Sequence, residues 1–269
     1  MRKDEKYKTI ISVLLIVIIL QWIFIIATRP KKPRRPAPIP KPPAPLVVKI
    51  KGNIAIVLDD WGYNLNNLAM LEEIKYPLTL SVLPNLPYST EVAQEAHKLG
   101  LEVILHLPME PYEKLRLEKN TVLTGMDETK IQNILKTDLG DIPYVRGVSN
   151  HMGSRATGDP KVMGVLFREL KKRDLYFLDS FVSAKTIGAR LAKDIGLYFI
   201  KRDIFIDNNQ EYGYIEGQLN KLKKIAGSYG RAVGIGHDRK VTLQVLGDLM
   251  PEIEKEGYRF VLVSDLIKR

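Results

Sequence analysis

The sequence predicts an α/β protein, a distorted barrel of seven or eight β/α units preceded by one transmembrane helix. From residue 52 onward, apolar strand-like runs alternate with amphipathic helical stretches, a pattern typical of parallel β/α units. The stretch 10–28 is apolar on all sides, whereas helices of soluble domains show a polar face. A chain of 269 residues has room for one barrel of about 200 to 250 residues.

The amino-terminal region predicts a membrane anchor. After a basic flank at residues 1–9, residues 10–28 are almost entirely apolar, with only Ser12 and Gln21 as polar interruptions. At the helical rise this stretch spans about 28 Å, close to one hydrocarbon core. A cleaved signal peptide is disfavoured because the apolar stretch is long and no small-x-small site precedes Arg29. We therefore expect an uncleaved signal anchor that joins the chain to a membrane.

The distribution of charge argues against nucleic acid as a partner. Residues 29–51 are rich in Pro, Lys and Arg, which predicts an extended linker without a core of its own. Residues 1–51 carry twelve Lys/Arg and two Asp/Glu, and the rest of the chain carries 29 of each. Because the domain predicted at 52–269 is formally neutral, it offers no charge excess for binding phosphates. The absence of Cys also excludes thiolate nucleophiles and Cys-bound zinc.

The periodicity of the domain predicts eight strands and several helices. We expect the strands over residues 54–58, 78–83, 103–107, 145–149, 176–178, 197–200, 232–235 and 260–263, with helices over 91–99, 129–139 and 161–172 between them. Asp159 and Pro160 are suited to be the N-cap and the first residue of the last of these helices. A doubly wound open sheet would share this alternation, but no glycine-rich dinucleotide motif follows the first strand.

Titratable side chains follow several of the predicted strands. Asp59 and Asp60 come after the first, and three of the four histidines, His106, His151 and His237, come after later strands. Chemistry in parallel α/β folds lies at the carboxyl ends of the strands. A helix-capping turn would explain either aspartate alone, but two adjacent carboxylates repel each other unless a cation or a proton lies between them. Together these five residues predict a site.

Weaker signals lie on the same rim, and one histidine is set apart. Asp179 follows the fifth strand, and Arg202 and Asp203 follow the sixth, although Asp is also common in loops and caps. His97 falls near the end of a predicted helix, where an imidazole suits the helix dipole. We expect no catalytic role for His97.

Neutral imidazoles and carboxylates without thiolates suit a divalent metal ion, most simply zinc, with open positions for water and substrate. Such an ion lowers the pKa of bound water and polarises a carbonyl group, which amide or ester hydrolysis requires. A remaining carboxylate and a free imidazole would then serve as base and acid. The residues alone leave open which of the five holds the ion.

The segments IAIVLDDWG, HLPMEP, NHMGS, FLDS, RDIFID and IGHD, in this order, resemble the divergent polysaccharide deacetylase family, a relative of chitin-oligosaccharide and peptidoglycan deacetylases. The resemblance implies that Asp59 is the base, that Asp60 and His106 bind metal, and that His237 is the general acid. The classical motif has a second histidine where this chain has Glu110. The resemblance therefore places the third ligand at His151, with Glu110 as the alternative. The remaining candidates for supporting or substrate-binding roles are Glu110, Asn150, Asp179, Arg202, Asp203 and Asp238.

The resemblance implies a metal-dependent hydrolase that removes an N-acyl group, such as acetyl, from an envelope polysaccharide. Two alternatives stay open: a glycosidase with two carboxylates across one sugar bond, and an envelope scaffold that binds glycan without turnover. Counting Lys and Arg around the apolar stretch 10–28 would keep the domain in the cytosol. Since wall polysaccharides lie outside the cell, we nevertheless expect the domain on the outer side of a bacterial cytoplasmic membrane.

Overall fold

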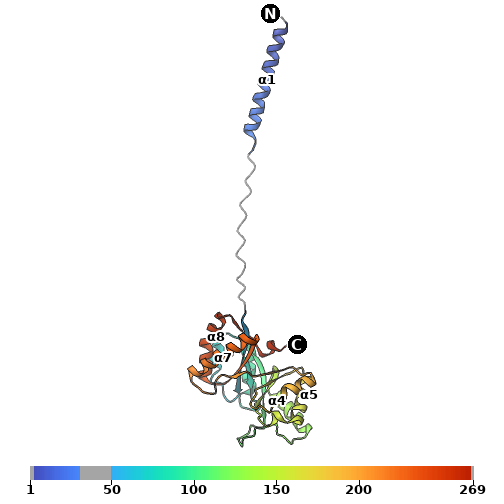
Figure 1. Cartoon of the computed structure of the whole chain (residues 1–269), viewed down its shortest axis with the longest axis vertical. Coiled ribbons are helices and arrows are strands. Elements are labelled where there is room, and N and C mark those ends of the chain that lie inside the picture. Colours follow the sequence, from blue (N-terminus) through green and yellow to red (C-terminus); the bar gives the residue numbers. More distant parts are fainter. Residues whose placement is uncertain (1–2, 31–49, 268–269) are drawn as a thin grey trace. The chain divides into compact units, whose positions relative to one another are not determined.

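The computed structural model describes residues 3–30 and 50–267, which form two units considered separately. The first contains a single helix, α1 (Lys3–Thr28), drawn in blue in Figure 1. Within it, Asp4–Thr28 is long and apolar enough to cross a membrane. The predicted linker 29–51 falls largely on residues 31–49, which lie outside the described residues.

The second unit is a sheet of nine strands in the described chain, all paired in parallel. The strands are β1 (Gly52–Trp61), β2 (Thr79–Val82), β3 (Glu102–Met109), β4 (Val145–Met152), β5 (Tyr176–Asp179), β6 (Phe199–Lys201), β7 (Ile204–Phe205), β8 (Arg231–His237) and β9 (Tyr258–Phe260). Their order is β6-β5-β4-β3-β2-β1-β8-β7, and β9 pairs with the start of β1. The path begins and ends on β6 and β7, which are neighbours in the chain. No ladder joins these two among the residues described, so the barrel is distorted and open at this point.

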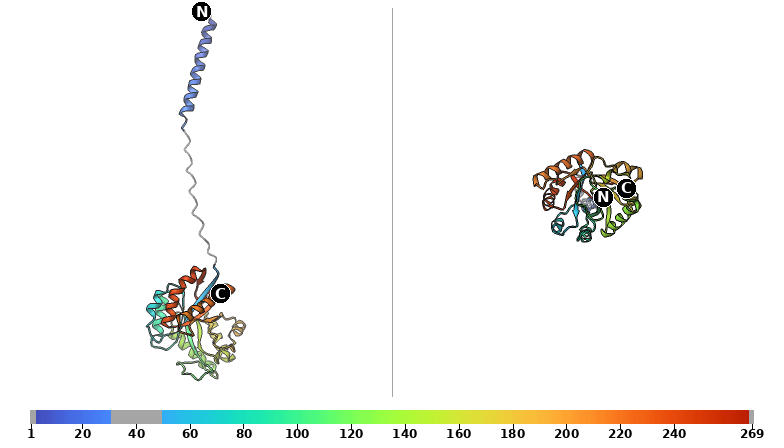
Figure 2. Two further views of the ribbon diagram at one scale, coloured as in Figure 1. Left: turned by 60° about the vertical axis from the view of Figure 1, so that its left-hand side comes forward. Right: turned by 90° about the horizontal axis from the view of Figure 1, so that it is seen from below.

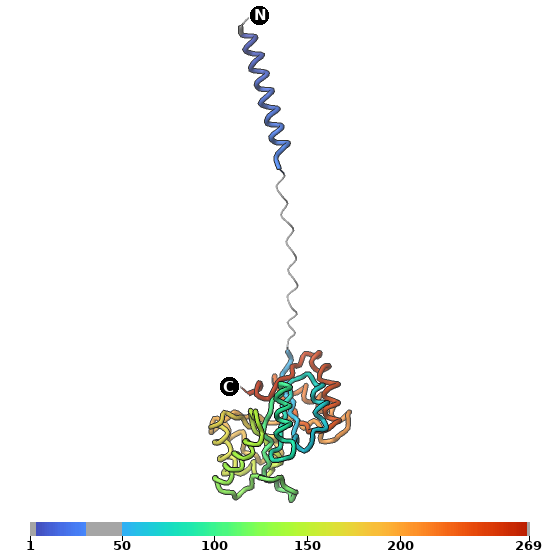
Figure 3. Tube along the Cα trace, turned by 180° about the vertical axis from the view of Figure 1, so that it is seen from behind, coloured from blue at the N-terminus to red at the C-terminus, as the bar shows by residue number. Residues whose placement is uncertain are grey.

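Helices cover the outside of the curled sheet, as the right-hand view of Figure 2 shows. They are α2 (Leu68–Glu73), α3 (Ser89–Lys98), α4 (Glu128–Asp141), α5 (Pro160–Lys172), α6 (Gly188–Ile195), α7 (Tyr212–Tyr229), α8 (Lys240–Lys255) and α9 (Val263–Leu266), with a short 3-10 turn at Ala156–Gly158. Helices α7 and α8 lie on one side of the domain and α4 and α5 on the other (Figures 1 and 3). The distorted α/β barrel predicted from the sequence is confirmed.

Three details of the predicted strands are wrong. The last predicted strand, 260–263, is replaced by β9, which ends at Phe260, and by α9, which begins at Val263. The two-residue strand β7 was not predicted, because its periodicity is too short to detect. Strands β1, β3, β4 and β8 also extend beyond their apolar stretches, so they contain the side chains that were expected to follow them: Asp59, Asp60, His106, His151 and His237.

The local sequence explains how several elements start. Asp159 caps α5 by accepting hydrogen bonds from the backbone N–H groups of Lys161 and Val162, both at 2.9 Å, and Pro160 occupies the first turn as predicted. Gly52 is the first residue of β1. A Cβ at this position would overlap the backbone carbonyl of Ala226 in α7, so only glycine leaves room for the helix. Helix α7 can therefore pack directly against the start of the central strand.

Strand alternation separates two apolar cores. The larger core lies between the sheet and the helices, and the smaller one fills the barrel interior. The buried residues of the interior are Ala55, Val57, Ile104, Tyr176, Leu178, Ile200, Val233, Ile235, Val261, Val263 and Leu266. We call the end of the barrel at the carboxyl ends of the strands its upper end. Toward this end, the same alternation along β1, β3 and β8 leads to Asp59, His106 and His237. The site is therefore the top layer of the barrel interior.

Candidate metal and catalytic site

A bulge near the end of β1 brings two adjacent carboxylates to one site. Leu58 pairs with Leu80 and Trp61 pairs with Val82, so β1 holds one more residue than β2 between these pairs. Successive side chains of a strand normally point to opposite faces, but a bulge changes the direction of one of them. Asp60 adopts a left-handed backbone with φ 67°. As a result, Asp59 Oδ2 and Asp60 Oδ1 lie 3.7 and 3.3 Å from the Nε2 atom of His106.

Asp60, His106 and His151 converge on one point. Asp60 Oδ1 lies 3.1 Å from His151 Nδ1, and His151 Nδ1 lies 3.3 Å from His106 Nε2. These ligand atoms all lie within 4.8 Å of one another. Donors about 2.0 to 2.1 Å from a tetrahedral zinc ion are separated from each other by about 3.3 Å. The spacing and the chemistry of this donor set thus fit a divalent ion with at least one position left for water or substrate.

A chain of hydroxyl groups orients His106. Its Nδ1 atom lies 2.7 Å from Ser149 Oγ, which in turn lies 2.7 Å from Ser81 Oγ, and all three residues are buried. With Nδ1 engaged by Ser149, the Nε2 atom is directed at the carboxylates. Metal-binding histidines commonly use their second nitrogen in this way. Ser81 and Ser149 were not predicted from the sequence, although both follow the inward alternation of their strands.

The two aspartates differ in their surroundings. Asp59 is only 3% exposed, and burial raises its pKa, while the neighbouring His106 acts to lower it. Burial also acts to raise the pKa of Asp60, but its hydrogen bonds with His106 and His151 outweigh burial and hold that pKa well below its usual range. Asp60 is therefore suited to remain an anionic ligand, and Asp59 is suited to accept a proton.

His237 lies next to Asp59 across the β1–β8 ladder, in which the two residues are paired. Its Nδ1 atom lies 2.8 Å from Oδ1 of the fully buried Asp207, and its backbone N–H donates to Asp207 Oδ2, also at 2.8 Å. Burial acts to lower the pKa of His237, but the hydrogen bond and charge of Asp207 outweigh it, so the pKa is raised above 6.5. Asp207 also accepts from Thr242 Oγ1 at 2.7 Å, and its own pKa is lowered because these hydrogen bonds and the charge of His237 outweigh burial.

Asp207 was not predicted as a site residue. It is the last residue of the RDIFID segment, and the signal that could have identified it is a polar residue directly after the buried Ile206. Only the fold shows that it meets His237, because the two are thirty positions apart and are brought together by the pairing of β7 with β8.

Residues 56–267 match the family described as divergent polysaccharide deacetylase. The chain belongs to this family. The uncharacterized protein YibQ of Escherichia coli K12 is 36% identical over 201 residues, which cover 75% of this chain and 63% of that protein. This chain thus spans less than two thirds of that relative. Family membership supports a deacetylase-type role.

Two solved structures share the fold. The uncharacterized protein ATU2773 of Agrobacterium tumefaciens C58 superposes with a TM-score of 0.75 at 24% identity, covering 81% of this chain and 89% of that chain. The peptidoglycan deacetylase Bd3279 of Bdellovibrio bacteriovorus superposes with a TM-score of 0.52 at 13% identity, covering 80% of this chain and 53% of that chain. The architecture is therefore that of known deacetylases of this kind.

Asn150 and Asp179 lie at the carboxyl ends of β4 and β5 and support the backbone near the candidate site. The buried Asn150 side chain donates to the Met152 carbonyl at 2.7 Å and accepts from the Ser180 N–H at 2.9 Å. These bonds hold the backbone on both sides of His151. Asp179 accepts from Thr186 Oγ1 at 2.7 Å, and burial raises its pKa. Both residues support the loops after β4 and β5.

Arg202 and Asp203 lie at the opening of the barrel. The Arg202 guanidinium donates to the Ser180 carbonyl at 2.7 Å and stacks 3.7 Å from the centre of the Phe205 ring, which itself stacks on His237. Burial lowers the pKa of Arg202. Asp203 instead accepts from the Val233 N–H at 2.8 Å and is exposed, so its role is to hold the start of β7 against β8.

The last two candidates, Glu110 and Asp238, bind structural partners. Glu110 accepts from Thr124 Oγ1 at 2.6 Å and pairs with Arg155 at 3.1 Å. The structure places this carboxylate in the loops after β3 and β4, apart from the group of Asp60, His106 and His151 that could hold a metal ion. Asp238 accepts from Asn67 Nδ2 at 2.7 Å, and burial raises its pKa.

His97 lies outside the site, as expected. It is in the last turn of α3 and stacks on Tyr144 at 3.8 Å between ring centres. It therefore provides a structural histidine for comparison with His106, His151 and His237.

Proposed function

We propose that this protein is a metal-dependent hydrolase that removes an N-acyl group, such as acetyl, from an envelope polysaccharide. The observation that carries the proposal is the convergence of Asp60, His106 and His151 on one point, with Asp59 on one side and the His237–Asp207 pair beside it. A scaffold would not require this arrangement. A glycosidase would require two carboxylates across a sugar bond but not two imidazoles and a carboxylate that share one centre.

Asp60, His106 and His151 would hold the ion. When bound, a divalent ion would polarise the amide carbonyl of the substrate and lower the pKa of water, which eases the proton loss that makes water nucleophilic. Asp59 has the position and burial of a general base, because its Oδ2 lies 3.7 Å from Nε2 of His106 and its side chain is almost fully buried. Its raised pKa favours accepting a proton from the attacking water.

His237 would donate the proton that the leaving amine needs. Asp207 occupies its Nδ1 side, so the Nε2–H remains directed away from the buried carboxylate and is available to the substrate. The raised pKa favours the protonated imidazole, which is the form that can donate a proton. Asp59 and His237 are paired across neighbouring strands, so base and acid act on the same amide.

The experiment that tests this function is a combined metal and product assay on the full chain in a mild detergent. We expect a stoichiometric divalent ion, most simply zinc, and release of acetate from N-acetylglucosamine oligomers or from peptidoglycan. Asp59→Asn should abolish acetate release while retaining the ion. Chain shortening of the oligomers without acetate would identify a glycosidase, and a metal-free, inactive protein would support the scaffold.

We further propose that α1 anchors the domain on the outer side of a bacterial cytoplasmic membrane, where wall polysaccharide lies. The support is the length and apolar composition of Asp4–Thr28 together with the substrate class proposed above. A reporter fused after the last residue should be active only outside the cytosol. Resistance of the domain to protease added to intact spheroplasts would place it inside and overturn this part.

A further inference from the structure

A protruding segment beside the site carries exposed apolar side chains. Residues 110–127 connect β3 to α4, and we call the part from 111 to 121 the β3–α4 arm. Tyr112 is 54% exposed, Leu115 54% and Leu117 39%. Tyr63, which comes shortly after Asp60, donates to Glu118 of the arm at 2.6 Å. The arm is thus fixed against the loop that leaves the metal-binding strand, at the same end of the barrel as His106.

The arm is also positively charged. Lys114, Arg116 and Lys119 are exposed, and within the part of the chain that the structure describes none of them forms a salt bridge. Its two carboxylates accept hydrogen bonds from neutral hydroxyl groups, Glu113 from Ser154 Oγ at 3.1 Å and Glu118 from Tyr63. The three cations outnumber these carboxylates by one, in a chain that is formally neutral beyond residue 51.

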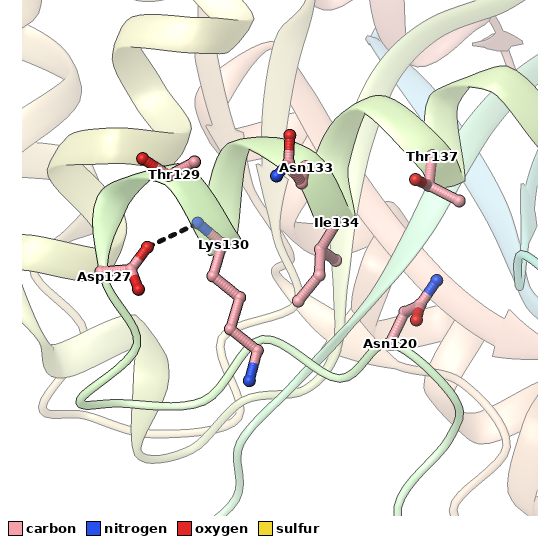
Figure 4. Close-up of a pocket in the computed structure, with 7 residues that line it drawn as sticks. All are labelled: Asn120, Asp127, Thr129, Lys130, Asn133, Ile134 and Thr137. Atoms are coloured by element: carbon pink, nitrogen blue, oxygen red, sulfur yellow. Dashed lines mark hydrogen bonds between the residues drawn. The ribbon is translucent and has the colours of Figure 1, made fainter.

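Further cations lie on both flanks of the arm. The Lys185 ammonium lies 5.1 Å from the centre of the Tyr112 ring. On the other flank, a hollow of about 500 Å³ is lined by Asn120, Asp127, Thr129, Lys130, Asn133, Ile134 and Thr137. Figure 4 shows the Lys130 side chain extended into this hollow, while Asp127 is engaged as the cap of α4. The recess beside the arm is thus mainly polar, and Lys130 is the cation in its lining.

We infer that the β3–α4 arm binds an acidic glycan, a polymer whose sugars carry carboxylate or phosphate groups. This inference rests on the proposed function and specifies its substrate. The C–H faces of sugar rings would pack on Tyr112 and Leu115, as exposed apolar surface beside a site is suited to bind a ligand. The anionic groups would pair with Lys114, Arg116 and Lys119. Each exposed ion pair contributes little alone, so the arm combines several cations with apolar contact.

Binding measurements separate this inference from the proposed function, because they do not require turnover. The full chain in a nonionic detergent is titrated with three tetrasaccharides: neutral N-acetylglucosamine oligomer, the alternating oligomer with N-acetylmuramic acid, which carries carboxylates, and a phosphorylated N-acetylglucosamine oligomer. We expect an acidic form to bind about tenfold more tightly than the neutral one at low ionic strength, with the difference shrinking as salt is added. Whichever acidic form is preferred identifies the anionic group.

The variants decide where this preference arises. Lys114→Gln/Arg116→Gln/Lys119→Gln should remove the preference for the acidic oligomer and leave the neutral one bound as before, and Tyr112→Ala should weaken both. The matched control Lys193→Gln/Lys221→Gln/Lys224→Gln removes three exposed cations elsewhere and should change neither. Equal binding of all three oligomers, or a preference that survives in the arm variant, overturns the inference. Arm-dependent binding to micelles doped with phosphatidylglycerol, without arm-dependent binding of any oligomer, would assign the arm to a lipid surface and also overturn it.

Discussion

The two ends of the barrel interior are built by the same strand alternation but filled in opposite ways. At the lower end, Val57, Ile104 and Leu178 are fully buried and pack on one another. At the upper end, the next inward positions of β1 and β3 are Asp59 and His106, with the ion-binding partners around them. One layer, about 6 to 7 Å along a strand, thus separates an apolar core from a cluster of titratable groups.

The lower end also holds one carboxylate, Glu102, and its hydrogen-bond partners differ from the neighbours of Asp59 and Asp60. Glu102 Oε1 accepts from Thr79 Oγ1 and from the Tyr176 hydroxyl, both at 2.9 Å, and from the Ser264 N–H at the start of α9. Neutral donors bind one oxygen of this carboxylate, and its Oε2 is buried without a hydrogen-bond partner among the described residues, whereas Asp59 and Asp60 face each other and two imidazoles. The comparison contrasts a buried carboxylate held by neutral donors with two carboxylates placed among other titratable groups.

Removing a side chain from the upper end should give the largest effect. His106→Ala should lose the bound ion and bring acetate release to background, because one of three protein ligands is lost. His97→Ala serves as the control, since its imidazole stacks on Tyr144 away from the site. Elemental analysis and acetate assays on both variants check this. Parent-level metal in His106→Ala would exclude the cluster as the ion site.

Next in size is the loss of the general acid. His237→Ala should lower turnover by about 100-fold or more while retaining the ion, because proton donation to a leaving group contributes on this scale. Asp207→Asn should have a smaller effect and shift the alkaline limb of the activity profile to lower pH, since the charge that raises the pKa of His237 is lost. Steady-state kinetics across pH, with metal content measured in parallel, tests both. Loss of the ion in His237→Ala would contradict this assignment.

At the lower end, truncating a side chain to alanine should reduce the stability of the fold without changing the metal content. Ile104→Ala, two residues before His106 on the same face, removes a fully buried side chain and should cost about 2 to 5 kcal/mol of unfolding free energy. Urea titration of the full chain in detergent measures the loss, and metal analysis should match the parent. If Ile104→Ala loses the ion under native conditions, the two layers are coupled more strongly than the comparison implies.

A smaller cost is expected at Glu102. Glu102→Ala leaves the hydroxyl groups of Thr79 and Tyr176 without their acceptor, which should cost about 1 to 3 kcal/mol. Glu102→Gln retains an acceptor and should cost less. The same urea titrations compare the two variants. Equal destabilisation by both would mean that the charge of Glu102, and not its acceptor oxygen, closes the lower end.

The smallest effect concerns pH. The pKa of His237 is raised above 6.5, so its stabilising contribution is complete below that value and is lost as pH rises through the raised pKa. The pKa of Asp207 is lowered below 3.8, so its contribution is complete above that value and is lost as pH falls through the lowered pKa. The stability difference between the parent and His237→Gln, measured after chelation, should therefore be greatest between these limits. A difference that grows above neutral pH would contradict the pairing.

Several features of the fold and of the site can be predicted from the sequence, because each depends on residues that are neighbours in the chain. Apolar length predicts a membrane-spanning helix at α1, and positions at the carboxyl ends of predicted strands predict that Asp59, His106 and His237 come together at one end of the barrel. The Asp159–Pro160 pair predicts the start of α5 through backbone capping, which involves only neighbouring residues. These features require no knowledge of which strand lies beside which.

Other features of the site depend on segments that are far apart in the chain, and only the tertiary structure shows them. The bulge that turns Asp60 toward His106 arises from the register between β1 and β2, and the meeting of Asp207 with His237 arises from the pairing of β7 with β8. Glu110 has the right chemistry for a ligand, but Thr124 and Arg155 bind it elsewhere. Residue type and spacing cannot distinguish His151 from Glu110, because the position of each side chain is determined by strand pairing and loop contacts.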